Sequence, residues 1–437
     1  MALPSLIEIV PLDQPVRAEI TMPGSKSITN RALILAALAE GETILTGALW
    51  SEDTQVMVEC LQELGFMVNI EPDPHETCNR TITVYGEGGR VPPGGTADQP
   101  KELYVGNAGT AARFLAALVC LGKGIYRLHG VPRMHERPQA ALFKALRELG
   151  YRVETEQGND RLPVLIQGAG QKVGAKCKVS IEQSSQFASA LLLCARYGGW
   201  HIKITGENAE ESPYVAMTVK LIEAFPHRRG RFQIEPDASS GSYFWGAAWL
   251  FERAGFSNEM MVYDWPRTES RWQVDAQFRM YIGLGLDVGM KNVISRLNEL
   301  ADSIMTAIVL APLAGQPVKF IHLGRLRVQE TERVVALRTE LTRCGAKVVE
   351  EGDTLTVYPS QLHGAEIETY EDHRLAMCFA ILGLKVPGIK IKNPACVKKT
   401  FPNFFQKLAG PPPNGLGATI LDARTGQKLE FDDLFAG

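Results

Sequence analysis

The chain has 437 residues, of which 45% are hydrophobic and 22% charged, and its formal net charge is −3. This length exceeds one ordinary hydrophobic core, so two domains are expected, and the composition excludes a disordered or fibrous chain. The weak net charge excludes a global basic field for nucleic acid, so any strongly anionic ligand has to meet a local cluster of Lys and Arg.

The eight cysteines are scattered without a C-x-x-C pair, which favours reduced thiols in the core over disulfides or a metal site; they are Cys60, Cys78, Cys120, Cys177, Cys194, Cys344, Cys378 and Cys396. Residues 1–11 lack the basic and apolar regions of a secretion signal. The apolar stretches are interrupted too soon to span a bilayer. We therefore expect a cytoplasmic protein that binds neither membrane nor nucleic acid.

One pattern returns six times along the chain: a polar loop, a helix rich in Ala and Leu, a glycine and a short β-rich run. The copies open at Gly24 (GSKSITNRALILAALAEG), Gly106 (GNAGTAARFLAALVCLGKG), Ser184 (SSQFASALLLCARYGG), Asp237 (DASSGSYFWGAAWLFERAG), Asp302 (DSIMTAIVLAPLAG) and Asp372 (DHRLAMCFAILG). The helices carry few charges, which predicts burial on most sides. Runs such as HIKITG and VKFIHLG predict short strands after them.

Three repeats per domain predict two similar α/β domains, with buried helices and outward-facing sheets. The boundary is expected after the charged turn PHRRGRF, so that residues 22–234 form the first lobe. Residues 1–21 are expected to return to the second lobe, which otherwise comprises 235–409. Residues 410–437 match no repeat, and their PPP run marks a stop. We treat them as a C-terminal extension of unknown role.

The polar loops precede helices, and helix N-termini favour anions because their N–H groups are exposed and carry partial positive charge. Polar and basic residues gather there: Lys26, Ser27, Arg31, Asn107, Gly109, Thr110, Arg113, Ser184, Ser185, Gln186, Asp372, His373 and Arg374. The second helix of three repeats is predicted to begin with a basic residue, namely Arg137, Arg333 and Lys399. A cation opposes the dipole there, so its recurrence predicts a ligand with several anionic groups, such as a phosphate and a carboxylate.

Five segments closely resemble the hallmark segments of EPSP synthases, within the enolpyruvyl transferase family: GSKSITNRALILAALAEG, GNAGTAARFLAAL, PRMHERP, DHRLAMCF and KKTFPNFF. The resemblance extends over residues 5–408. It implies the enolpyruvyl transferase inverse barrel, in which two lobes of three βαβαββ units close over phosphoenolpyruvate and shikimate 3-phosphate at the interdomain cleft. It also implies a monomer without metal or cofactor.

The reaction implied by the resemblance transfers the enolpyruvyl group to the 5-hydroxyl of shikimate 3-phosphate, through a tetrahedral intermediate that then releases phosphate. The resemblance assigns Lys26 to both substrates and to catalysis, Asp302 to the acceptor hydroxyl as base, and Glu330 to proton handling. It assigns phosphoenolpyruvate binding to Gly109, Arg137, Gln186, Arg333, Arg374 and Lys399. It assigns shikimate 3-phosphate binding to Ser27, Arg31, Ser184, Ser185, Gln186, Tyr214 and Asp302, and to the positions of Arg325 and Gln329.

The chain departs from its relatives in the acceptor pocket, where Glu211 replaces a usual Ser, Arg325 an Asn and Gln329 a Lys. A carboxylate beside a phosphate is costly. Either Glu211 turns away or pairs with Arg325, or the pocket accepts a related cyclitol that lacks the phosphate. A non-catalytic anion-binding descendant is a further alternative. The sister UDP-N-acetylglucosamine enolpyruvyl transferase is disfavoured, because RMHERPQAA lacks that family's reactive cysteine.

The resemblance also implies inhibition by glyphosate at the phosphoenolpyruvate site. Gly109 keeps the small residue that leaves room for the inhibitor, whereas Phe114 stands where many relatives have proline. The bulk of Phe114 at the end of the first helical turn is expected to tilt the helix and narrow the pocket. Of these opposing features, Gly109 favours sensitivity.

Overall fold

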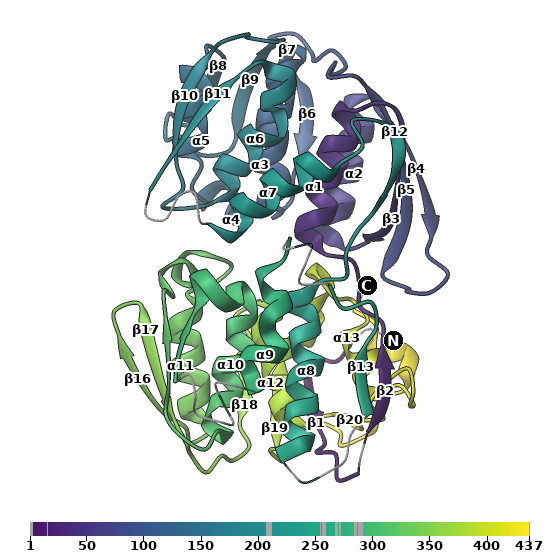
Figure 1. The fold of residues 1–437 in the computed structure, drawn as a ribbon, viewed down its shortest axis with the longest axis vertical. Helices are drawn as coiled ribbons and strands as arrows, with labels where there is room; N and C mark the ends of the chain where they lie inside the picture. The colour runs from purple at the N-terminus through teal and green to yellow at the C-terminus, as the bar shows by residue number, and fades with distance from the viewer. Residues whose placement is uncertain are drawn as a thin grey trace. The chain divides into compact units, whose positions relative to one another are not determined.

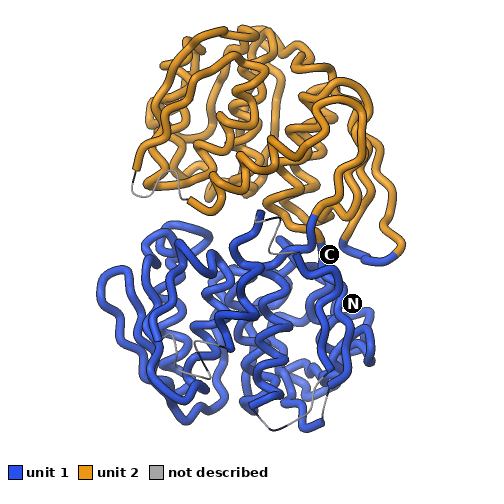
Figure 2. The backbone as a smooth tube through the Cα atoms, in the orientation of Figure 1, with its two compact units in different colours: residues 1–23, 75–78, 235–437 blue, residues 24–74, 79–234 orange. Residues whose placement is uncertain are grey.

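The computed structural model of the chain describes residues 3–14, 16–206, 212–253, 255, 259–266, 270, 272–283, 286 and 292–436. The chain forms two compact units, shown in Figure 2. Unit 1 comprises residues 1–23, 75–78 and 235–437, and unit 2 comprises residues 24–74 and 79–234. The chain passes from unit 2 to unit 1 between residues 234 and 235, just after the charged turn PHRRGRF. Residues 75–78 also belong to unit 1, although nothing in the repeat pattern indicates this.

Unit 2 contains three sheets. The first has the order β12 (Arg228–Gln233), β3 (Glu40–Leu49), β5 (Asn79–Glu87) and β4 (Met67–Pro72). The second has the order β6 (Lys101–Tyr104), β7 (Lys123–His129), β9 (Val164–Ala169) and β8 (Arg152–Thr155). The third pairs β10 (Lys176–Ser180) with β11 (His201–Thr205). In each four-stranded sheet the first pair is parallel and the others antiparallel.

The helices of unit 2 are α1 (Lys26–Leu38), α2 (Glu52–Leu64), α3 (Gly109–Leu118), α4 (Pro132–Glu136), α5 (Ala140–Glu148), α6 (Gln186–Gly198) and α7 (Pro213–Ala224), with the short 3₁₀ turn η1 (Val119–Leu121). Figure 1 shows α1, α3 and α6 inside the unit with the sheets around them. Every residue of α3 is buried, and so is every residue of α1 after Ser27. The prediction of helices buried on most sides is thus confirmed here.

Unit 1 is built the same way. One sheet has the order β18 (Glu366–Ile367), β19 (Ile389–Lys392), β1 (Leu6–Ile9) and β20 (Ile420–Asp422). A second has the order β14 (Val293–Ser295), β15 (Val318–Ile321), β17 (Thr354–Tyr358) and β16 (Lys347–Glu351), and a third pairs β13 (Glu259–Val262) with β2 (Arg17–Ile20). The N-terminal strands β1 and β2 therefore both belong to unit 1.

The helices of unit 1 are α8 (Ala238–Arg253), α9 (Phe278–Ile282), α10 (Ile304–Leu310), α11 (Arg333–Arg343), α12 (His373–Gly383) and α13 (Phe404–Ala409). Short turns connect them: η2 (Val274–Gln277), η4 (Arg296–Leu300), η5 (Ala301–Ser303), η6 (Ala311–Leu313), η7 (Gly324–Val328), η8 (Pro394–Lys399) and η9 (Phe431–Leu434). All residues of α10 are buried, and all of α12 except Arg374. These helices form the core of the unit.

The six predicted repeats are confirmed by one shared pairing rule. The strand that follows each buried helix pairs in parallel with a strand from elsewhere in the chain. The pairs are β3 with β12, β7 with β6, β11 with β10, β13 with β2, β15 with β14, and β19 with β18. Each buried helix therefore begins at an equivalent place in its repeat, and so does the polar loop that precedes it.

The C-terminal segment, which matches no repeat, is part of the core of unit 1. Its strand β20 pairs antiparallel with β1, with Ile9 opposite Ile420. Leu434 is fully buried, and the N–H of Ala436 donates to the carbonyl of Pro402 at 2.9 Å. The segment was undetectable from periodicity because it adds an edge strand and a turn, and it adds no further helical repeat.

Residues 75–78 are held in unit 1 by one buried carboxylate. Glu76 is 4% exposed, and its oxygens accept hydrogen bonds from the Thr21 hydroxyl and the Asn403 amide, each at 2.7 Å. The Lys407 ammonium lies 2.7 Å from the same side chain. A paired and hydrogen-bonded carboxylate tolerates burial, so this short segment is fixed by specific contacts.

Two of the basic residues predicted to begin helices do not. Arg137 directly follows α4 in an extended conformation, as expected before Pro138. Lys399 is the last residue of η8, where a cation is favoured by the dipole. Arg333 alone begins a helix, α11. The prediction was wrong for Arg137 and Lys399, and the opposed-dipole argument applies only to Arg333.

None of the helices that the structure describes combines the length and the hydropathy that a bilayer crossing requires. No disulfide joins the eight cysteines, all of which lie in the described residues, and seven of them are buried. Burial raises the pKa of Cys194 and of Cys378, by desolvation of the thiolate. These thiols therefore act as small apolar core residues.

The buried C-terminal tail gives a test of stability. We predict that Leu434→Ala costs about 2–5 kcal/mol, because truncating a fully buried leucine loses apolar contact and leaves a cavity. A lowered midpoint of thermal or urea unfolding measures the cost. Val349→Ala in the same unit, at a position 36% exposed, serves as the control and should change the midpoint little. Equal midpoints for the wild type and Leu434→Ala would show that the tail does not support the fold.

Candidate active site

In unit 2, Lys26 is the first residue of α1 and forms an ion pair. Its ammonium donates to Asp53 Oδ2 at 3.0 Å, and the side chains of the two residues are 17% and 6% exposed. Asp53 lies in the first turn of α2, where a carboxylate is favoured by the dipole. The pair holds the ammonium at the start of α1, while its partial exposure leaves it able to reach an anion.

Arg31, one turn further along α1, has its guanidinium turned into the core. It is 1% exposed and donates to the Thr218 hydroxyl at 2.7 Å, the Ser27 carbonyl at 2.8 Å and the Ser189 hydroxyl at 3.1 Å. Burial lowers the pKa of Arg31 to about 10, so it stays protonated at neutral pH. Through these bonds Arg31 joins α1 to α6 and α7.

Phe114 is fully buried and its ring centroid lies 5.2 Å from the Arg31 Cζ atom, in a cation–π contact. Helix α3 runs unbroken through this residue, from Gly109 to Leu118. The bulk of Phe114 is therefore packed in the core against Arg31.

Gln186 begins α6 and joins two neighbouring elements. Its amide oxygen accepts from Arg113 at 2.5 Å, and its amide nitrogen donates to the Thr110 hydroxyl at 3.1 Å. The Ser184 hydroxyl accepts from the Gln186 backbone N–H at 3.2 Å. Four of the polar residues predicted at helix starts, from repeats two and three, are thus brought together.

Gly109 and Arg137 lie in direct contact. A Cβ atom added at Gly109 would come within 2.6 Å of an Arg137 terminal nitrogen, which is closer than any real contact. The guanidinium also donates to the Asn107 carbonyl at 3.0 Å. The absence of a side chain at Gly109 therefore leaves the space that the Arg137 guanidinium occupies.

In unit 1, a buried ion pair links the starts of two helices. Arg333, 1% exposed, donates from Nε to Asp372 Oδ2 at 2.6 Å and from a terminal nitrogen to Oδ1 at 3.2 Å. Oδ1 also accepts from the N–H of Arg374 at 2.9 Å, so Asp372 caps α12. The two bonds match the fork of a guanidinium. The pair therefore fixes α11 and α12 relative to each other.

Asp302 lies among three guanidiniums. Its Oδ1 accepts from Arg296 at 2.7 Å, and its Oδ2 lies 3.5 Å from an Arg374 nitrogen and 4.0 Å from an Arg333 nitrogen. Burial alone would raise the pKa of this carboxyl, but the nearby charges of Arg374, Arg296 and Arg333 lower the pKa well below the usual range. Asp302 is therefore ionised across the physiological range of pH.

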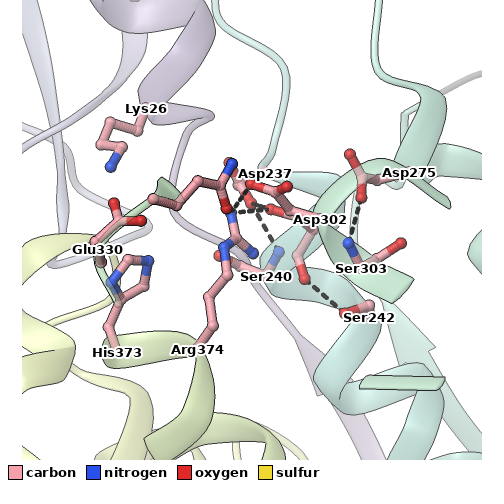
Figure 3. A network of polar contacts seen from close by, with 12 residues as sticks. Lys26, Asp237, Ser240, Ser242, Asp275, Asp302, Ser303, Glu330, His373 and Arg374 are labelled. Atoms are coloured by element: carbon pink, nitrogen blue, oxygen red, sulfur yellow. Dashed lines mark hydrogen bonds and ion pairs between the residues drawn. The ribbon is translucent and has the colours of Figure 1, made fainter. Parts of the chain in front are cut away.

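Asp275 is a second buried carboxyl beside Asp302, as Figure 3 shows. Its Oδ1 accepts from the Ser303 N–H at 2.7 Å, which supports the turn that carries Asp302. Burial and the negative charge of Asp302 raise the pKa of Asp275 to about 7. Two adjacent carboxyls whose pKa values are pushed apart in this way are typical of sites that handle protons.

Glu330 and Lys399 extend this cluster. The Glu330 carboxylate lies 2.9 Å from an Arg333 nitrogen and 3.6 Å from the Lys399 ammonium. On the other side, Arg374 donates to the Ser239 hydroxyl at 3.1 Å at the start of α8. The cluster therefore joins residues from repeats four, five and six, and its named members are Lys399, Glu330, Arg333, Asp372, Asp302, Arg296, Arg374, Asp275 and Ser239.

The acceptor-pocket residues have mixed positions. Gln329, which replaces a lysine, accepts a hydrogen bond from Arg333 through its amide oxygen. Arg325 lies half-buried in η7. Glu211 lies outside the described residues, so its predicted choice between pairing and turning away remains a prediction.

Other predicted ligands of the acceptor lie at helix starts in unit 2. Ser185 precedes α6 and is buried, and Tyr214 lies half-buried in the first turn of α7. His373, named with the polar residues of repeat six, is 1% exposed, with Nδ1 4.0 Å from Asp372.

Sequence reasoning missed Asp53, Asp275 and Arg296 altogether. Asp53 stands in the first turn of α2, two residues after the N-cap residue Ser51, which is a usable signal. Asp275 and Arg296 lie in irregular turns outside the repeat openings. Within the described residues no group of three His, Cys, Asp or Glu side chains forms a candidate metal site.

Comparison with known proteins decides the family. Residues 11–408 match the family described as EPSP synthase (3-phosphoshikimate 1-carboxyvinyltransferase). The chain belongs to the EPSP synthase family. Among curated relatives, the 3-phosphoshikimate 1-carboxyvinyltransferase of Trichormus variabilis is 37% identical over 92% of this chain and 98% of its own length. That of Opitutus terrae is also 37% identical, over 94% and 98%.

Solved structures agree on the fold. An EPSP synthase from Acinetobacter baumannii superposes with a TM-score of 0.67 at 20% identity, covering 95% of this chain and 99% of that one. The enolpyruvyl transferase NikO from Streptomyces tendae superposes with a TM-score of 0.64 at 18% identity, covering 96% and 99%. The predicted enolpyruvyl transferase fold is therefore confirmed.

The contact between Gly109 and Arg137 yields a direct test. Gly109→Ala is expected to displace the Arg137 guanidinium, because the added Cβ overlaps it. The displaced atoms are the far end of a flexible side chain, so the fold should be little affected. We predict a raised KM for phosphoenolpyruvate and weaker competition by glyphosate, with an unfolding midpoint close to the wild type. Steady-state kinetics with glyphosate titration measure both. An unchanged KM and inhibition constant would contradict the proposed contact of Arg137 with the substrate.

Proposed function

We propose that the chain is an enzyme that transfers the enolpyruvyl group of phosphoenolpyruvate to the 5-hydroxyl of shikimate 3-phosphate and releases phosphate, the step of the shikimate pathway that serves aromatic amino acid biosynthesis. Membership of the family, near-complete coverage of relatives that carry this name, and the motifs in this sequence support the proposal. The observation that carries it is the buried cluster of unit 1, in which an ionised carboxylate lies beside several cations.

The charges of that cluster suit a small, strongly anionic substrate. Arg296, Arg333, Arg374 and Lys399 supply four cations around Asp302 and the neighbouring side chains of Glu330, Asp372 and Asp275. A phosphate and a carboxylate suit these cations, since guanidiniums bind both in bidentate fashion.

We assign roles residue by residue from the family resemblance. Phosphoenolpyruvate is bound by Lys26, Gly109, Arg137 and Gln186 of unit 2 and by Arg333, Arg374 and Lys399 of unit 1. The acceptor is bound by Lys26, Ser27, Ser184, Ser185, Gln186, Tyr214, Asp302, Arg325 and Gln329. Arg31 contributes mainly by holding α1, α6 and α7 together, because its N–H groups already bond within unit 2.

The chemistry proceeds by addition and elimination. The acceptor hydroxyl gives its proton to Asp302 while the methylene carbon of phosphoenolpyruvate gains a proton from Glu330 or Lys26. The acceptor oxygen bonds to C2, which gives a tetrahedral ketal phosphate. The C2–O bond to phosphate then breaks as the methyl group returns a proton to the group that supplied one, Glu330 or Lys26, so the enolpyruvyl product and phosphate leave. The surrounding cations stabilise the charge on the phosphate as it changes.

The environment of Asp302 gives a reason why proton transfer from the acceptor would follow the binding of both substrates. In the free protein three guanidiniums stabilise its carboxylate and make it a weak base. Phosphoenolpyruvate anions bound to Arg333 and Arg374 would offset that positive charge and raise the pKa of Asp302. Proton transfer from the acceptor would then become favourable only when both substrates are bound.

A phosphate-release assay with phosphoenolpyruvate and a panel of acceptors tests the function. We predict release with shikimate 3-phosphate, and none with phosphoenolpyruvate alone. Arg374→Ala should lower kcat/KM by roughly a hundredfold or more, equivalent to about 2–4 kcal/mol of transition-state stabilisation. Arg343→Ala, a partly exposed arginine on α11 in the same unit, is the control.

No release from shikimate 3-phosphate at millimolar concentration, together with release from a cyclitol that lacks the phosphate, would replace the acceptor but keep the enolpyruvyl transferase chemistry. No release with any acceptor would favour a non-catalytic anion-binding protein. Near-normal kcat/KM for Arg374→Ala would contradict the assigned site.

A further inference from the structure

Arg296 stands apart from the other buried arginines of the chain. It is 5% exposed and begins η4, six residues before Asp302. Within the described residues it makes one hydrogen bond, from a terminal nitrogen to Asp302 Oδ1 at 2.7 Å, and its Nε–H is buried without an acceptor. An unsatisfied buried donor costs roughly 1–3 kcal/mol, so the residue is poorly explained as a support for the fold.

Arg31 and Arg333 show how buried arginines with several partners bond in this protein. Arg31 donates to four acceptors in unit 2, and Arg333 makes a two-pronged bond to Asp372 together with contacts to Gln329 and Glu330. Both guanidiniums join several elements. Arg296 instead directs its single bond at the carboxylate that the resemblance names as the base.

The backbone between the two residues is fixed in an uncommon conformation. Ala301 has φ +37° and ψ −122°, a region that a residue with a Cβ rarely adopts. At the start of η4, the Ser295 hydroxyl accepts from the Asn298 N–H at 3.2 Å, and the Ser295 N–H donates to Glu299 at 2.8 Å. The short segment from Arg296 to Asp302 is therefore fixed by hydrogen bonds at its start, and its backbone is strained at Ala301, just before Asp302. Backbone strain of this kind is common at functional sites.

We propose that Arg296 is a positioning residue for Asp302: it holds Oδ1 and so presents Oδ2 on the side of Arg374 and Arg333. This proposal rests on the proposed function, in which Asp302 accepts the acceptor's proton. The distances indicate that the two oxygens have different roles, since Oδ1 lies 2.7 Å from Arg296 whereas Oδ2 lies 3.5 Å from Arg374 and 4.0 Å from Arg333. A carboxylate bound firmly through one oxygen keeps the other oriented for a substrate hydroxyl.

The charged groups that face Asp302 come from four elements. Arg296 is on η4, Arg333 on α11, Arg374 on α12, and the carboxyl of Asp275 on η2. The three cations lower the pKa of Asp302 and Asp275 opposes them. Substrate anions can compensate Arg333 and Arg374. Arg296 is outside the set of arginines assigned to phosphoenolpyruvate, so its charge continues to act on Asp302 in the loaded enzyme.

The test is the pH dependence of kcat/KM for the acceptor. A base with a lowered pKa works down to low pH, and activity is lost only as pH falls through that pKa. Removing the charge of Arg296 raises the pKa of Asp302. The acid limb of Arg296→Gln should therefore lie about 1–3 pH units above that of the wild type, the range by which one adjacent arginine lowers a carboxyl pKa.

Three further variants make the result specific. Arg338→Gln removes a cation from a partly exposed site on α11 that pairs with Glu350, and its acid limb should coincide with the wild type. Arg296→Lys keeps the charge but not the planar donor geometry, so its limb should move less than that of Arg296→Gln while kcat falls at least tenfold. Asp302→Asn combined with Arg296→Gln should show no limb from Asp302. Near-ultraviolet circular dichroism and unfolding midpoints verify folding.

A folded Arg296→Gln whose acid limb coincides with the wild type overturns the proposal, whatever its kcat. If Arg296→Gln does not fold, Arg296→Lys decides: wild-type kcat with an unmoved limb overturns the proposal, and a lowered kcat supports it. Failure of the wild type to release phosphate from phosphoenolpyruvate and shikimate 3-phosphate is a separate result, which would count against the proposed function.

Discussion

The carboxylate of Asp302, held between three guanidiniums, is the contact on which the account of function depends. Buried arginines require partners, because an unpaired buried charge is strongly destabilising. In unit 1 the partners are carboxylates at the starts of buried helices: Asp372 caps α12 and pairs with Arg333, and Asp302 precedes α10. The fold thus satisfies its buried charges at the N-termini of buried helices.

This arrangement couples stability to function. The carboxylates hold in place the same cations that are assigned to phosphoenolpyruvate: Arg333 pairs with Asp372 and Glu330, and Lys399 pairs with Glu330. In unit 2 the cations have other kinds of partner: Arg31 donates to neutral hydroxyl oxygens, and Lys26 pairs with Asp53. Phosphoenolpyruvate, with a phosphate and a carboxylate, suits cations held in this way, since guanidiniums bind both groups.

Much of the fold could be predicted from the sequence, because helices such as α3 and α12 are apolar on every side and begin at equivalent loops. Prediction failed where no repeat carried the signal. The C-terminal strand β20 and residues 75–78 are held by local pairing and by the single carboxylate of Glu76. Arg137 and Lys399 were misplaced at helix starts: Arg137 is held extended by the Pro138 that follows it, and Lys399 ends the short turn η8.

The residues of the candidate site were likewise predicted only where a sequence motif carried them. The resemblance to the family named Lys26, Arg374, Gly109 and Gln186. The structure adds the contact of Gly109 with Arg137 and the hydrogen bonds that Gln186 makes. Asp275 and Arg296 could not be found from the sequence, because their importance comes from proximity to Asp302 across irregular turns. A carboxyl with a raised pKa beside one with a lowered pKa is a property of packing, and no spacing rule in the sequence encodes it.

The most direct test of this account is Asp302→Asn, measured both for phosphoenolpyruvate binding by calorimetry with shikimate 3-phosphate present and for turnover. The substitution removes the anion that competes for the guanidiniums and also removes the base. The account predicts that phosphoenolpyruvate binds at least as tightly as in the wild type, while phosphate release falls roughly a hundredfold or more. The exposed Asp353→Asn should match the wild type in both. Turnover of Asp302→Asn within a few-fold of the wild type would contradict the account.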